Sequence, residues 1–284
     1  NVLTVGDFAF AYSALQRVCL PDSMVRIGDC SFAFSQVRDI DFGRGIKSIS
    51  TESFKGCYNL QNLMISKFIT SIGGGAFVYC TSLATLEFEE NSSLLEIGGS
   101  AFENTDIMSL EIPQSVISIG SWAFAYNFNL STIAFQDFSQ LQRIDDYAFY
   151  ANLNLTELYL PNHLASIGEY AFSGTGLSAL EIPQKVSTIG MGMVSSCPQL
   201  TSISVDINNK YYQSVDGILY SANGDTLVAY PAGNMQSVYR VLDGTKSVLG
   251  AAFKGSLYLS SIQLPESLEE IQEYAFSDCV SLES

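Results

Sequence analysis

The sequence predicts a solenoid, a chain wound into about eleven stacked turns, and three observations support this prediction. An Ala-Phe dipeptide or a close equivalent returns every 22 to 25 residues. Each turn also reads roughly as a strand-like phrase LxxLxLP, which is clear at 15–21, 155–161, 177–183 and 259–265. The regular period is interrupted once, between Met193 and Phe253. A repeat array grows by stacking turns, so the period predicts one solenoid over residues 1–284 instead of separate domains.

The anchor of every turn but one is a phenylalanine, usually that of an Ala-Phe pair. The anchors are Phe10, Phe32, Phe54, Phe77, Phe102, Phe124, Phe149, Phe172, Phe253 and Phe276. In the ninth turn, within IGMGMVSSC, the expected anchor is Met193. Eleven registrations of one pattern are far more than chance would give.

Each turn is predicted to begin with a strand that has one buried face. The phrase LSALEIP at 177–183 alternates apolar and polar residues, which is typical of a half-buried strand. Proline directly after the phrase ends the ladder because it has no N–H to donate. A short second strand follows in SIG, whose glycine suits a positive φ, and the AFxxC step is about as long as one helical turn.

The interruption is predicted to be an insertion, over residues 206–238, within one turn of the array. Two β-prone runs, 218–221 and 226–230, flank the tetrapeptide ANGD. Asn-Gly tolerates the positive φ of a tight reversal, so these runs predict a β-hairpin. An apolar hairpin should pack against the edge of the solenoid and bury Leu219 and Leu227.

Composition and charge exclude several classes of function. The chain has 13 basic and 29 acidic residues, a formal charge of −16, which repels phosphate backbones and argues against nucleic acid as a partner. No run of eighteen apolar residues is present, and the first residues do not resemble a secretory signal. The chain begins and ends inside repeats, so we expect a piece of a longer protein, truncated at both ends, with any membrane anchor outside it.

The period of 22 to 25 residues with leucines at fixed offsets is the leucine-rich-repeat signature. More narrowly, the phrasing IP.SV.SIG..AF..C..L resembles the BspA-like leucine-rich repeats of bacterial cell-surface and secreted proteins. This resemblance implies a right-handed, β-rich superhelix with a parallel sheet on one face. It also implies a cell-surface or secreted location and adhesion or ligand binding without catalysis or a cofactor. The insertion resembles a hairpin unit that recurs in the same family.

Small residues three or four positions after the anchor are predicted to form a ladder inside the solenoid. A thiol or amide there can satisfy loop backbone groups or pack in the core. The ladder residues are Cys57, Cys80, Asn127, Asn152, Cys197 and Cys279. The chain has no CxxC pair and a single histidine, so neither a zinc site nor another metal site is expected.

Two surfaces are candidate contact sites. On the strands, side chains at the third and fifth positions of LxxLxL should point away from the core. These positions give a band of carboxylates with one tyrosine: Asp39, Asp41, Glu87, Glu111, Glu157, Tyr159 and Glu181. The band either binds a ligand or only keeps the surface solvated. The second candidate consists of the insertion's tyrosines, Tyr211, Tyr212, Tyr220 and Tyr230, with burial of Tyr220 or Tyr230 as the open alternative.

Three functions fit this sequence. The first is a non-catalytic, monomeric adhesion protein whose solenoid face binds a host or neighbour-cell protein or a glycan. The second is a passive spacer or targeting module attached to a domain outside this chain. The third is a glycosidase that uses paired carboxylates, which need a separation of about 5 to 9.5 Å. An open solenoid face provides neither a cleft nor a buried acid, which disfavours the enzyme.

Overall fold

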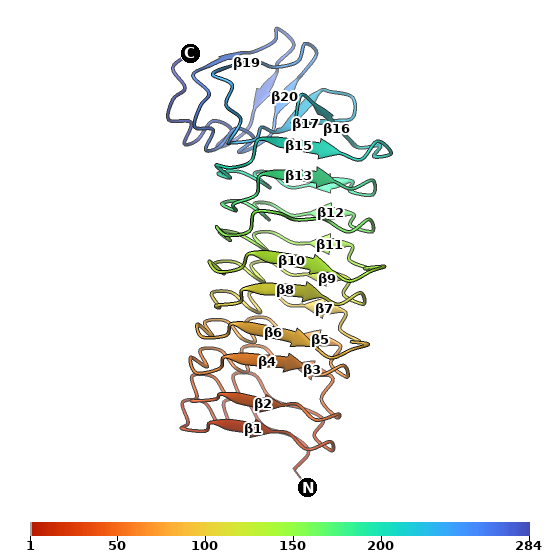
Figure 1. The fold of residues 1–284 in the computed structure, drawn as a ribbon, viewed down its shortest axis with the longest axis vertical. Coiled ribbons are helices and arrows are strands. Elements are labelled where there is room, and N and C mark those ends of the chain that lie inside the picture. Colours follow the sequence, from red (N-terminus) through yellow and green to blue (C-terminus); the bar gives the residue numbers. More distant parts are fainter. Residues whose placement is uncertain (1) are drawn as a thin grey trace.

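The computed structural model describes residues 2–284, which form a parallel β-solenoid of about eleven turns (Figure 1). Each turn passes through a first strand, a short second strand and a loop that carries the anchor residue. The predicted leucine-rich-repeat solenoid is confirmed. Within residues 2–284 no helix has the length and apolar character needed to cross a bilayer.

The first strands of the turns form the strand face, on which neighbouring turns pair in parallel. Five two-stranded ladders are regular: β1–β2, β4–β6, β8–β10, β13–β15 and β19–β21. The strands are β1 (Arg17–Cys19), β2 (Asp39–Asp41), β4 (Asn62–Ile65), β6 (Thr85–Phe88), β8 (Ser109–Ile112), β10 (Thr132–Phe135), β13 (Ala179–Ile182), β15 (Ser202–Val205), β19 (Val238–Arg240) and β21 (Ser261–Gln263). The expected strand at 155–160 keeps the alternation of burial but forms no regular ladder.

The short second strands form a sheet of their own, the short-strand face. Seven of them pair in parallel without a break, and a further sheet continues through the insertion toward the C-terminus. The strands are β3 (Ser48–Ile49), β5 (Ser71–Ile72), β7 (Glu96–Ile97), β9 (Ser118–Ile119), β11 (Arg143–Ile144), β12 (Ser166–Ile167), β14 (Thr188–Ile189), β20 (Ser247–Val248) and β22 (Glu270–Ile271).

The anchor loops contain no helical turn, so that part of the prediction is wrong. Residues two before and two after each anchor have positive φ; around Phe102 they are Ser100 at 54° and Asn104 at 56°. A left-handed residue interrupts a right-handed helical path. The loop N–H groups also donate to the next turn, as from Phe102 to Ala123 at 2.8 Å. Stacking between turns, not a local helix, therefore fixes these loops.

The anchor rings form a column through the centre of the solenoid. Eight phenylalanines, from Phe10 to Phe172, stack with centroids 5.1 to 5.7 Å apart and planes within 10° of parallel. All of them except the terminal Phe10 are buried. The column is the part of the core that repeats identically from turn to turn.

The Cys and Asn residues of the proposed ladder lie beside this column. Cys57 donates from Sγ to the carbonyl of Phe32 at 3.3 Å, and Asn127 donates to that of Phe102 at 3.0 Å. Cys279 is half-buried, and the others are fully buried. Burial raises the pKa of Cys57 to about 11. All six cysteines are free thiols, so the ladder satisfies loop carbonyls of the preceding turn without disulfides.

The ninth turn has its anchor at Val194, one residue after the predicted Met193. The N–H of Phe172 donates to the carbonyl of Met193, as Phe149 donates to the residue just before Phe172. Met193 therefore takes the alanine position of the Ala-Phe pair. With this correction Cys197 lies three residues after its anchor, like the other ladder cysteines. Valine is smaller than phenylalanine, and the ring column stops here.

The insertion is a three-stranded antiparallel meander and not a lone hairpin. The predicted hairpin is present as β17 (Ile218–Ser221) and β18 (Thr226–Ala229), and β16 (Tyr212–Val215) pairs with β17 on its other side. The turn from β16 to β17 is Asp216-Gly217, both with positive φ. Asp-Gly is a strong hairpin signal for such a turn, and it could have revealed β16 from the sequence. β18 also pairs in parallel with β20, so it serves as a short second strand.

The meander lies between two parts of the core. Leu219 belongs to the core cluster of the preceding turns. Its neighbours Ile218 and Tyr220 belong to the cluster of the last turns, because successive strand residues point to opposite faces. The burial expected for Leu219 and Leu227 is confirmed. Figure 1 shows the turns up to β15 as one stack and the last turns, around β19, set at an angle to it.

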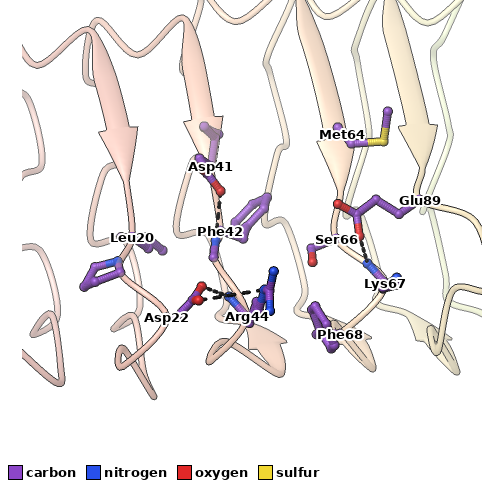
Figure 2. Close-up of a pocket in the computed structure, with 13 residues that line it drawn as sticks. Leu20, Asp22, Asp41, Phe42, Arg44, Met64, Ser66, Lys67, Phe68 and Glu89 are labelled. Atoms are coloured by element: carbon purple, nitrogen blue, oxygen red, sulfur yellow. Dashed lines mark hydrogen bonds and ion pairs between the residues drawn. The ribbon is translucent and has the colours of Figure 1, made fainter.

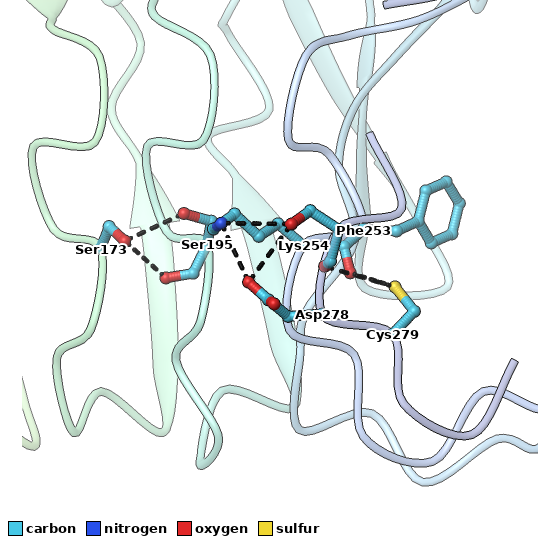
Figure 3. Close-up of polar contacts among 7 residues, drawn as sticks. Ser173, Ser195, Phe253, Lys254, Asp278 and Cys279 are labelled. Carbon is cyan, nitrogen blue, oxygen red and sulfur yellow. Dashed lines mark hydrogen bonds and ion pairs between the residues drawn. The ribbon is translucent and has the colours of Figure 1, made fainter. Parts of the chain in front are cut away.

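On the loop side, the turns before and after the meander meet directly. The N–H of Ser196 donates to the carbonyl of Lys254 at 3.0 Å. Figure 3 shows Lys254 paired with Asp278 at 3.0 Å, a contact that holds the pKa of this carboxyl below its usual value. The same figure shows Cys279 donating to Phe253, as in the ladder of the earlier turns. The meander therefore separates the strand faces of the turns before and after it, whereas the anchor loops of these turns remain in contact. This difference accounts for the angle between the two parts of the stack.

Tyr230 occupies an anchor position, so its assignment to a contact surface needs correction. Its ring stacks on Phe253 with centroids 4.9 Å apart, and its N–H donates to Ala252 at 2.8 Å. Tyr220 is also buried, and its hydroxyl pairs with that of Tyr239 at 2.6 Å. The alternative of burial holds for both tyrosines. Ala229-Tyr230 is an Ala-aromatic pair, a signal that sequence reasoning overlooked.

We expect Tyr230→Phe to stabilise the protein by about 1 kcal/mol. The Tyr230 hydroxyl is buried and has no hydrogen-bond partner within residues 2–284, and its removal ends that desolvation cost. The matched control is Tyr220→Phe, which deletes a hydroxyl that is hydrogen-bonded and should destabilise by about 1 kcal/mol. Urea denaturation followed by circular dichroism measures both variants. Equal shifts of the two in the same direction would contradict this assignment.

Candidate functional site

The strand face carries the predicted band of polar side chains on its outer surface. Each strand buries its leucine or isoleucine and exposes the residues between, as in β8, where Leu110 is buried beside exposed Ser109 and Glu111. All seven predicted residues of the band are exposed: Asp39, Asp41, Glu87, Glu111, Glu157, Tyr159 and Glu181. The alternation of strand side chains thus predicts the exposure of these residues. The contacts that each makes with neighbouring side chains determine which of them are free to bind a ligand.

The two carboxylates at the N-terminal end of the band make contacts within the protein. The parallel register sets Arg17 beside Asp39, and their side chains form an ion pair at 3.4 Å. Asp41 accepts a hydrogen bond from the N–H of Gly43 at 3.0 Å and so shapes the turn after β2. These two carboxylates therefore have structural roles.

A groove over β4, β6, β8 and β10 brings two of the predicted carboxylates together. Its volume is about 500 Å³, and its lining includes Glu87 and Glu111. Met64 lies opposite Glu87 in the register, and Ala134 lies opposite Glu111. Neither carboxylate has a hydrogen-bond or ion-pair partner in the part of the chain that the structure describes. We call this site the sheet groove.

A second cavity lies at the carboxyl ends of β1, β2 and β4 and adjoins the sheet groove at Met64 (Figure 2). It has a volume of about 790 Å³ and is lined by both charges, including Arg44 and Lys67. Arg44 pairs with Asp22 at 3.8 Å, and the N–H of Lys67 donates to Glu89 at 3.0 Å. Asp41 on β2 and Met64 on β4 belong to its lining, but Arg44, Lys67 and Glu89 lie in the loops after the strands, outside the repeat phrase, so sequence reasoning missed this cavity.

The charge along the solenoid is uneven. Residues 68–142 contain eight carboxylates and no lysine or arginine, whereas seven of the thirteen basic residues precede this stretch. Glu87 and Glu111 lie within this stretch, so no lysine or arginine of their own turns compensates their charge. Like charges on one face raise the local concentration of cationic partners.

The remaining predicted residues lie outside the groove. Glu157 and Tyr159 belong to the turn at 155–160, which has no regular ladder, and Tyr159 is 80% exposed. Glu181 lies on β13, further along the face. In the insertion, Tyr211 is exposed, and Tyr212 is half-buried with its hydroxyl donating to Ser187. Of the four insertion tyrosines only Tyr211 therefore keeps a largely free surface.

Within residues 2–284 no group of three or more His, Cys, Asp or Glu side chains is arranged to hold a metal ion.

The family model described as the BspA type Leucine rich repeat region matches residues 3–131, 117–215 and 233–284, in six copies. The chain belongs to this BspA-type leucine-rich repeat family. The matched ranges omit residues 216–232, which hold β17 and β18. A search of curated proteins gives no match.

Several solved structures share this BspA-type fold. The pneumococcal vaccine antigen PcpA aligns at a TM-score of 0.63 and 23% identity, over 95% of this chain and 60% of that one. A leucine-rich repeat protein of Bacteroides ovatus aligns at 0.58 and 23%, over 99% and 69%. One from Eubacterium ventriosum aligns at 0.56 and 21%, over 87% and 58%. This chain thus spans about three fifths of PcpA, and the likeness establishes the fold alone.

Proposed function

We propose that this chain is a non-catalytic binding protein, on the cell surface or secreted, that recognises a protein or glycan through the sheet groove. The observation that carries the proposal is the pair Glu87 and Glu111, exposed and unpaired beside Met64, on turns without a cation. Membership of the BspA-type family and the likeness to a pneumococcal antigen support the location.

The groove favours binding over catalysis. Both carboxylates stand on an open sheet in contact with water, whereas a glycosidase needs one carboxyl held in an apolar pocket so that it keeps its proton near neutral pH. The only histidine, His163, is exposed in a turn and lines neither cavity. These features describe a surface that holds a partner by charge and apolar contact.

A protein with basic residues is the partner class that the charge favours. Two free carboxylates flanked by the apolar side chains of Met64 and Ala134 suit lysine or arginine side chains, whose alkyl stems are apolar and whose ends are cationic. A glycan could use the same carboxylates through its hydroxyl groups. The two classes are separated by the salt dependence of binding, which is strong only for the charged partner.

The test is a binding screen of the wild-type chain on arrays of matrix proteins and glycans, followed by variants. We expect the double variant Glu87→Gln, Glu111→Gln to weaken binding of the selected partner by about tenfold, since exposed charge pairs contribute up to about 1 kcal/mol each. The matched control is Glu157→Gln with Glu181→Gln, which changes the same charge on the same face outside the groove.

Three results would contradict the proposal. Equal weakening by both double variants would show that only the overall acidity matters. Absence of any partner on the arrays would favour the spacer role. Turnover of a glycan that Glu111→Gln abolishes would instead establish the enzyme.

A further inference from the structure

A slot on the loop side of the solenoid lies between Tyr79 and Tyr126. Both residues stand two positions after the anchor, in the fourth and the sixth turn. The turn between them carries Asn104 at this position. The cavity has a volume of about 270 Å³ and is lined by these three residues with Glu103 and Phe128. It is lined by residues of the anchor loops and shares none with the sheet groove, which lies over the first strands.

The width of the slot follows from the spacing of the turns. Where two successive turns carry aromatic residues at this position, the rings stack, as Tyr12 and Phe34 do at 5.1 Å and 12°. In the three successive turns of the slot, this position holds Tyr79, Asn104 and Tyr126, so Asn104 leaves a space between two tyrosine rings. Two turns amount to about 10 Å, and a planar group in contact with both rings needs about 3.5 Å on each side. The slot therefore admits one planar group.

The face of Tyr126 is directed along the stack toward this slot. Its ring lies within 22° of Trp122, and Trp122 stacks on Tyr147 of the next turn at 4.2 Å and 5°. The edge of Tyr150 packs against Tyr126 at 81° and holds the ring in place. The aromatic wall of the slot is thus supported from behind before any ligand arrives.

The slot also contains an uncompensated negative charge. Glu103 makes no hydrogen bond through its carboxylate and no ion pair within residues 2–284, and residues 68–142 have no lysine or arginine. Glu103 is near enough to contribute, after burial, to the raised pKa of Tyr126. Aromatic faces next to a free carboxylate attract a cation, and a flat guanidinium stacks better than an ammonium.

We propose that this slot binds an arginine side chain of a partner protein. The guanidinium stacks between the rings of Tyr79 and Tyr126 and pairs with the carboxylate of Glu103, while Phe128 covers the alkyl stem. The proposal does not depend on the sheet groove, because the two sites lie on different sides of the solenoid and share no residue.

The decisive variant is Asn104→Tyr, which restores the missing ring and fills the slot. The backbone accepts it, because Asn104 at φ 56° has the conformation that Tyr79 and Tyr126 already adopt at 61° and 59°. The probe is a fluorescent peptide of alternating glycine and arginine, in about 150 mM salt to suppress long-range attraction. The same peptide with citrulline in place of arginine keeps the shape without the charge.

We expect Asn104→Tyr and Glu103→Gln each to weaken binding of the arginine peptide by about fivefold or more, and citrulline to weaken it similarly. Glu96→Gln, an exposed glutamate on β7, should leave binding unchanged. The double variant of Glu87 and Glu111 should also leave it unchanged, which separates this proposal from the sheet groove.

Three outcomes would overturn the proposal. Equal loss in Glu96→Gln and Glu103→Gln would show that the peptide responds only to overall charge. Unchanged binding to Asn104→Tyr, with a wild-type circular dichroism spectrum, would place the peptide elsewhere. Equal binding of the citrulline peptide would show a site for neutral groups. Should Asn104→Tyr not fold, Tyr79→Leu provides the same test, because Tyr79 is 40% exposed and outside the core.

Discussion

Phe102→Ala is expected to lower the free energy of unfolding by about 3 to 5 kcal/mol, the range for truncating a buried phenylalanine. Its side chain is completely buried, and its ring stacks on Phe77 and Phe124, each at 5.3 Å. Truncation would leave a cavity that the neighbouring turns cannot close, because their loops are tied to one another by backbone hydrogen bonds. Urea denaturation followed by circular dichroism and by Trp122 fluorescence measures the loss.

The matched control is Phe138→Ala, which removes an equal ring that is 86% exposed. It should change the stability by less than about 0.5 kcal/mol. A loss below about 1 kcal/mol for Phe102→Ala would mean that the ring column does not stabilise the central turns. Because a solenoid is stabilised by contacts between neighbouring turns, the Trp122 signal, one turn away, should report the damage first.

Asn127→Ala is expected to destabilise the protein by about 3 kcal/mol. The buried amide accepts hydrogen bonds from the N–H and the hydroxyl of Thr105, at 2.7 and 2.8 Å, and donates to the carbonyls of Phe102 and Phe124. Alanine leaves the N–H of Thr105 buried without a partner, and an unpaired buried group costs about 1 to 3 kcal/mol. The two carbonyls lose one donor each but keep Thr105 and Asn152 as donors. Denaturation in urea again provides the measurement.

Two variants define what this amide does. Asn127→Cys should recover about half of the loss, because a thiol at the equivalent position of the third turn, Cys57, donates to the preceding anchor carbonyl. Asn129→Ala, which removes an exposed amide bonded to Asp106, should cost less than about 1 kcal/mol. If cysteine proved no better than alanine, the thiols of the ladder would be fillers of space and not donors.

Much of the binding surface could be predicted because strand side chains alternate regardless of what surrounds them. Glu87 and Glu111 were placed on the outer face by counting positions in LxxLxL, and they do line the sheet groove. The groove itself could not be predicted, since its walls come from the register between turns and the loops that follow them. The slot at Asn104 was also missed, because it depends on a small residue that lies between two tyrosines, Tyr79 and Tyr126, of the neighbouring turns.

The errors have a common physical origin. The helical turn was inferred from the length of AFxxC, but only every second loop N–H donates along the loop, and those between them donate to the next turn. Met193 was chosen as an anchor by its position in the repeat period, while the hydrogen-bond register selects Val194. Tyr220 and Tyr230 were assigned to a contact surface because they lie in an insertion, yet Tyr220 on β17 and Tyr230, just after β18, both pack in the core of the last turns.

The sequence by itself determined the solenoid, its period, the ring column and the outward band of carboxylates. These features depend on spacing within one turn, and spacing is local information. Only the tertiary structure decided where the stack changes direction, which tyrosines are buried and which carboxylates remain free. Those outcomes depend on the partner that each segment meets, such as β18 on β20 or Ser196 on Lys254. The partners lie about 20 to 60 residues apart, so no repeat phrase contains them.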